Sequence, residues 1–105
     1  MQPMEITEGN FAKEVLESPV PVLVDFYASW CGPCMVMSPI VDLLAENADG
    51  YKVGKINVDE QPTLATANRI MSIPTLVVFK GGKPSGRLVG VQSEQDILAL
   101  IKKNM

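Results

Sequence analysis

The chain is organised around residues 22–34, which read Val22-Leu23-Val24-Asp25-Phe26-Tyr27-Ala28-Ser29-Trp30-Cys31-Gly32-Pro33-Cys34. Residues 22–28 are mostly β-branched and aromatic and apolar on both faces apart from one aspartate, which is typical of a buried central strand, often a parallel one. Pro33 suits the first turn of a helix, because the N–H that it lacks would have no helical partner there. The stretch therefore predicts a strand that leads directly into a helix, with two cysteines at the junction.

The segments that follow extend this junction into a strand–helix–strand unit. After the predicted helix, residues 52–58 are predicted to form a second strand. Two strands joined through a helix lie parallel, with a right-handed crossover. Residues 76–79 predict a third strand, and a turn at residues 81–82 returns the chain to an antiparallel strand at residues 87–89.

Three further helices are predicted to cover this sheet. One bears Phe11 and Val15 at helical spacing, a short one is capped by Asp59, and the last starts from a cap at Ser93. Together these elements predict an α/β fold, with a central mixed β-sheet of four to five strands flanked by helices on both faces. At 105 residues the chain is expected to form one domain, residues 1–105.

The bulk composition limits the classes of function. Hydrophobic residues make up 47% of the chain, which argues against disorder, and a net charge of -3 argues against a general binder of nucleic acid. No apolar run approaches the roughly 18 residues that a membrane span needs. The start lacks the basic and apolar regions of a secretory signal. We therefore expect a soluble, cytoplasmic protein that works away from nucleic acid and membranes. The small size and the need for an open site favour a monomer.

The two cysteines at the junction point to redox chemistry. They are separated by two residues, and the chain has no other cysteine and no histidine. A structural zinc site needs four such ligands, and this chain has none to add to the two. A redox pair is therefore favoured over its alternatives, a purely structural disulfide or half of a metal site shared between two chains.

Position along the helix predicts different roles for the two thiols. Cys31 lies at the helix N-terminus, where unpaired N–H groups and the helix dipole stabilise a thiolate and lower its pKa. Cys34, one turn further in, is expected to be more buried and a poorer nucleophile. Cys31 is thus predicted to attack a substrate disulfide, and Cys34 to resolve the resulting mixed disulfide.

The chain resembles the thioredoxin family over essentially its whole length. The resemblance rests on residues 24–34, on Ser38-Pro39 and Ile73-Pro74-Thr75, and on Asn57-Val58-Asp59, Phe79-Lys80-Gly81-Gly82 and Val89-Gly90. It implies a thioredoxin fold and a protein-disulfide reductase that binds no cofactor and carries electrons in a Cys31–Cys34 disulfide. It also implies that a thioredoxin reductase supplies those electrons and that oxidised proteins receive them. Met35 departs from the family pattern, since many thioredoxins have a lysine or arginine there.

Asp25 is the unusual residue of the central strand. A carboxylate in such a strand is costly to bury, so its pKa is expected to be raised, unless the side chain is paired or turns to the surface. The resemblance implies that Asp25 lies beneath the cysteines and accepts the proton of Cys34 through water. Lys55, in the next parallel strand, is predicted to modulate Asp25, with an ordinary solvent-facing lysine as the alternative.

The resemblance also implies a docking face for substrates around Cys31, formed by Trp30, Ile73, Pro74, Gly90 and Val91. A lone tryptophan usually packs in a core, so a surface position for Trp30 is a specific expectation. The Ile73–Pro74 bond is expected to be cis by the same resemblance, although most such bonds are trans. The backbone of Ile73 would then pair with an extended substrate segment as a strand does.

Two other readings of the same motif stay open at this point. The Gly32-Pro33 dipeptide, expected to modulate the thiols, resembles that of reducing family members, but an oxidase or isomerase on the same fold is the alternative direction. The other reading is a non-catalytic scaffold, or a module in which two chains share a metal through Cys31 and Cys34. A scaffold does not need a costly buried Asp25, which argues against this reading.

Overall fold

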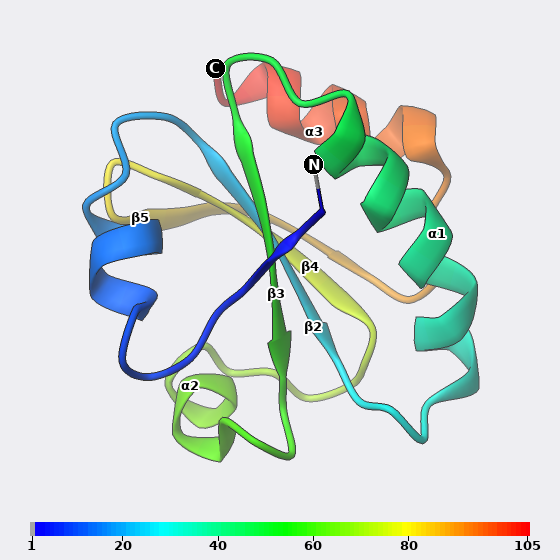
Figure 1. The fold of residues 1–105 in the computed structure, drawn as a ribbon. Coiled ribbons are helices and arrows are strands. Elements are labelled where there is room, and N and C mark those ends of the chain that lie inside the picture. Colours follow the sequence, from blue (N-terminus) through cyan, green and yellow to red (C-terminus); the bar gives the residue numbers. More distant parts are fainter. Residues whose placement is uncertain (1) are drawn as a thin grey trace.

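A five-stranded mixed sheet in the order β1-β3-β2-β4-β5 forms the centre of the computed structural model, which describes residues 2–105 (Figure 1). The strands are β1 (Met4–Glu5), β2 (Val22–Tyr27), β3 (Lys52–Asn57), β4 (Thr75–Lys80) and β5 (Lys83–Val89). The helical segments are the π-helix η1 (Ala12–Leu16) and the α-helices α1 (Gly32–Glu46), α2 (Pro62–Ala67) and α3 (Glu94–Lys103). The expected mixed sheet with flanking helices is confirmed.

The central strand β2 is paired on both sides, as its apolar sequence predicts. It runs parallel to β3, with Asp25 opposite Lys55, and antiparallel to β4, with Asp25 opposite Leu76. The parallel β2 and β3 are joined through α1, so the predicted strand–helix–strand unit is present. This arrangement places the start of α1 directly after the end of the central strand β2.

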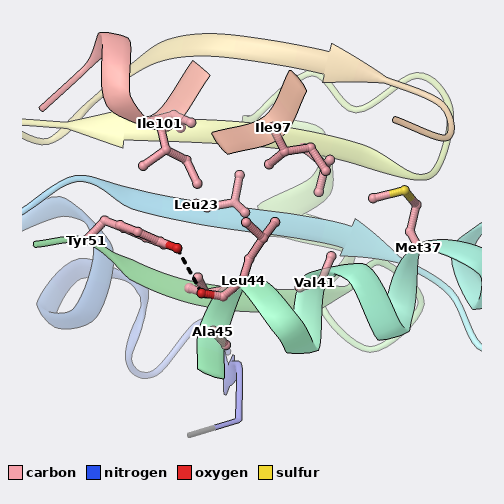
Figure 2. Packing of buried hydrophobic residues seen from close by; sticks show 11 residues of the cluster. Leu23, Met37, Val41, Leu44, Ala45, Tyr51, Ile97 and Ile101 are labelled. Atoms are coloured by element: carbon pink, nitrogen blue, oxygen red, sulfur yellow. Dashed lines mark hydrogen bonds between the residues drawn. The ribbon is translucent and has the colours of Figure 1, made fainter. Parts of the chain in front are cut away.

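Helices cover both faces of the sheet (Figure 1). On one face, α1 and α3 pack on Leu23 of β2, which lies between Leu44 of α1 and Ile97 and Ile101 of α3 (Figure 2). The Tyr51 hydroxyl closes this cluster by donating to the Leu44 carbonyl at 2.9 Å. On the other face, η1 and α2 cover a second cluster of buried apolar residues, which are Ile6, Val15, Val22, Val24, Phe26, Ile56, Leu64, Val77 and Phe79.

The predicted helix caps have different outcomes. Ser93 caps α3, because its hydroxyl accepts the Asp96 N–H at 3.1 Å. The prediction that Asp59 caps a helix is wrong. The Asn57 side-chain oxygen accepts the N–H groups of Asp59 and Glu60, and α2 begins only after Gln61, without a side-chain cap. Asn57 forms this turn itself, which leaves the Asp59 carboxylate available for a contact elsewhere.

Strand β1 has no counterpart among the predicted elements, because two residues are too few to show an alternating pattern. It adds to the parallel side of the sheet by pairing with β3. In the part of the chain that the structure describes, no helix is both long enough and apolar enough to cross a membrane.

Candidate active site

The junction of β2 and α1 holds both cysteines. Cys31 has extended backbone angles and is the N-cap residue of α1, and its Sγ accepts the Cys34 N–H at 3.2 Å. The two side chains form a disulfide, with their Cα atoms 5.2 Å apart. Because the helix N-terminus presents unpaired N–H groups, the Cys31 sulfur lies where negative charge is stabilised.

The expected difference in burial between the two cysteines is wrong for this oxidised form. Each residue is 4% exposed, since the disulfide holds both sulfurs in one cluster with Ala28. The two cysteines differ instead in their access to the protein surface. Cys31 lines a surface groove, and Cys34 is not among the residues that line it.

That groove has a volume of about 620 Å³ and borders the disulfide. Residues 30–33 form one side, and residues 70–73 form another, together with Val58 and part of α2. Trp30 is 71% exposed and Met71 is 93% exposed, so the expectation of a surface position for Trp30 is confirmed. The Ile73 carbonyl oxygen lies 3.9 Å from the Cys31 sulfur.

The expected docking residues divide into two groups. Trp30 and Ile73 line the groove, whereas Pro74, Gly90 and Val91 do not. The Ile73–Pro74 bond is cis, as expected, and Pro74 is buried. The Pro74 carbonyl accepts the Gly90 N–H at 2.8 Å, which ties Gly90 and the half-exposed Val91 beside it.

Sequence reasoning missed Asp59 as a partner of the site. The Trp30 Nε1–H donates to the Asp59 carboxylate at 2.7 Å and so orients the indole at the groove. The two residues come from different loops, and no local pattern links them.

Asp25 is buried as predicted, with 4% of its surface exposed. Its Oδ1 atom has no hydrogen-bond partner among the described residues. Burial raises the pKa of Asp25 to about 7, the positive charge of Lys55 acts to lower it, and the negative charge of Asp42 acts to raise it. Near neutral pH, a carboxyl group with this pKa can both accept and release a proton.

Lys55 is both opposite Asp25 and partly open to solvent. It faces Asp25 across the β2–β3 pair, yet about a third of its side chain is exposed. Gly32 and Pro33, between the cysteines, are both exposed.

A disulfide at the N-terminus of a helix that opens to a groove, next to a sheet whose central strand carries a buried carboxyl group, defines a thiol–disulfide oxidoreductase. Residues 2–103 match the family model described as thioredoxin. The chain belongs to the thioredoxin family, and the resemblance seen in its motifs is confirmed.

Similar proteins share this assignment over nearly the whole chain. Thioredoxin 1 of Nostoc sp. is 44% identical over 96% of this chain and 95% of its own. The M-type chloroplastic thioredoxin of Chlamydomonas reinhardtii is 46% identical over 93% of this chain and 71% of its own. Among solved structures, a single-residue mutant of the thioredoxin from Halobacterium salinarum is 38% identical, with a TM-score of 0.89 over 98% of this chain and 90% of its own.

The family assigns the chemistry of the junction. The protein is a protein-disulfide reductase, and the Cys31–Cys34 pair is its redox-active disulfide.

Proposed function

We propose that Cys31 attacks the substrate disulfide and that Cys34 completes the reaction. In the reduced protein, the Cys31 thiolate bonds to one substrate sulfur, and the other leaves as a thiolate. Cys34, once deprotonated, then attacks the Cys31 sulfur, which releases the second substrate thiolate and forms the Cys31–Cys34 disulfide. The substrate gains two electrons. The observation that carries this order is the position of Cys31 at both the groove and the helix N-terminus.

Asp25 is proposed to accept the Cys34 proton in the second step. Cys34 lies in the first turn of α1, the helix that covers the face of the sheet to which Asp25 belongs. A pKa of about 7 suits the task, because a general base works best when its pKa is close to the working pH. Lys55 modulates this group through its positive charge.

Substrate docking is proposed to use the groove and the segment that leads into β4. An extended substrate segment would pair with the backbone of Ile73, with Trp30 as an apolar wall and the half-exposed Val91 as a further apolar contact. Gly32 and Pro33 keep the approach to Cys31 uncharged, and the space beside Gly32 is open, since a Cβ there would contact nothing within 4 Å.

The partners follow from this role. We propose that a thioredoxin reductase supplies electrons, that oxidised proteins with accessible disulfides receive them, and that the protein works as a monomer in the cytoplasm. A net charge of -3 supports proteins over nucleic acid as partners.

Trapping of the mixed disulfide tests the two thiol roles. Reduced Cys34→Ser, mixed with an oxidised protein substrate, is expected to accumulate a covalent complex at Cys31, seen by non-reducing electrophoresis and mass spectrometry. Cys31→Ser is expected to trap none and to lose turnover, and the variant with both serines is the control. Accumulation of the complex by Cys31→Ser alone would reverse the roles.

The trapped complex also tests the docking mode. Hydrogen exchange of the Ile73 amide is expected to slow in the complex, because strand-like pairing engages the backbone there. Protection confined to other segments would remove Ile73 from the docking surface.

A further inference from the structure

Three charged residues form a row across the parallel part of the sheet. Glu5 of β1 faces Lys55 of β3, and Lys55 faces Asp25 of β2. Residues that face one another across adjacent strands project to the same side of the sheet. The row therefore alternates in sign, with a carboxylate on either side of one ammonium group.

The Glu5 carboxylate contacts the side chains of both Tyr27 and Lys55. The Tyr27 hydroxyl donates to Glu5 Oε1 at 3.0 Å, and the Lys55 Nζ lies 4.0 Å from Glu5 Oε2. The same ammonium lies 5.4 Å from the centre of the Tyr27 ring, within the range of a cation–π contact. Among residues 2–105, Lys55 forms its ion pair with Glu5 and not with Asp25.

Open space beside Lys55 leaves room for its side chain to adopt a position other than the one next to Glu5. A hollow of about 590 Å³ is lined by Glu5 and Lys55 from the sheet and by Ser38, Asp42 and Glu46 from α1. A lysine side chain beside open space keeps much of its rotamer freedom, so its position is set by the charges that attract it.

We propose that Glu5 is a positioning residue: by binding Lys55 and Tyr27 it withholds the Lys55 ammonium from Asp25 and so favours the protonated form of Asp25. Its relevance to catalysis rests on the proposed role of Asp25. Glu5 lies outside the motif that carries the chemistry, in a strand of two residues.

The charges that face Asp25 set the direction of the effect. Lys55 approaches from β3, Asp42 and Glu46 lie on α1, and β4 places the uncharged Leu76 opposite. Lys55 lowers the pKa of Asp25, so a residue that draws Lys55 away raises it. Glu5 also adds a negative charge of its own, which acts in the same direction.

A double-mutant cycle read by NMR tests the proposal on the full, oxidised chain. The carboxyl carbon of Asp25 is titrated in the unmodified protein, in Glu5→Gln, in Lys55→Met and in the variant with both changes. Glu5→Gln is expected to lower the pKa of Asp25 by about half a pH unit, and Lys55→Met to raise it. In the Lys55→Met background, Glu5→Gln is expected to lower the pKa of Asp25 by less than it does with Lys55 present, because only the charge of Glu5 itself is lost and no ammonium is left to reposition.

Glu8→Gln is the matched control for net charge. Glu8 is exposed, and its backbone N–H donates to the Gln61 side chain, away from Lys55. A Glu5→Gln shift no larger than the Glu8→Gln shift, or equal with and without Lys55, would overturn the proposal. The titration needs no turnover. An unchanged pH dependence of mixed-disulfide resolution in Asp25→Asn would instead remove the catalytic role of Asp25 and leave the cycle interpretable.

Discussion

The two faces of the sheet are packed differently, although one strand supplies both. To the face covered by η1 and α2, β2 contributes Val22, Val24 and Phe26, each at most 1% exposed, within a wholly apolar cluster. To the face covered by α1 and α3, it contributes Leu23 and the carboxyl group of Asp25. The buried carboxyl group of Asp25 therefore lies on the face of the sheet against which α1, the helix that begins at the redox disulfide, packs.

The cost of that placement depends on pH. The pKa of Asp25 is raised from 3.8 to about 7, so between these values the unfolded chain has released a proton that the folded protein still holds. Folding stability therefore falls as the pH rises through this window, and above pH 7 the full penalty of about 4 kcal/mol applies. The apolar face carries no such dependence.

Phe26→Ala is expected to have the largest effect on stability. Phe26 is fully buried on the apolar face, so the free energy of unfolding should fall by about 3–5 kcal/mol. Denaturant unfolding measures this loss. The NMR titration of Asp25 in the same variant is expected to stay unchanged, because the two side chains lie on opposite faces. A shifted titration would show that the faces are not independent.

Asp25→Asn removes the buried carboxyl group from the second face. Relative to the unmodified oxidised protein, its free energy of unfolding is expected to rise between about pH 4 and pH 7 and to level above pH 7, by up to about 4 kcal/mol. The reason is that asparagine has no proton to lose. Urea unfolding across this pH range measures the difference, and Asp49→Asn, the same change at an exposed position, is the control. A difference independent of pH would contradict the burial cost assigned to Asp25.

Trp30→Ala is expected to have the smallest effect on stability, because Trp30 belongs to neither face and is 71% exposed. The free energy of unfolding should change by less than about 1 kcal/mol, whereas KM for a protein disulfide should rise by about three- to tenfold. Trp30→Phe keeps an apolar ring and loses the N–H donated to Asp59, so it separates the two contributions. An unchanged KM in Trp30→Ala would exclude the groove as the docking surface.

Local sequence was enough to predict the core of this site. The strand, the helix and the disulfide follow one another within residues 22–34, so spacing and adjacency define their relation without knowledge of the rest of the chain. The burial of Asp25 also followed from its own strand, since both faces of that strand are apolar. Such features depend on periodicity and helix-terminus chemistry, which act over one or two turns.

Tertiary structure alone decided the contacts that surround this core. The equal burial of Cys31 and Cys34, and the hydrogen bond from Trp30 to Asp59, depend on how separate loops pack around α1. The row from Glu5 through Lys55 to Asp25 depends on the register of three strands. Register and loop packing are set by the free energy of the whole assembled core, so no segment contains them by itself.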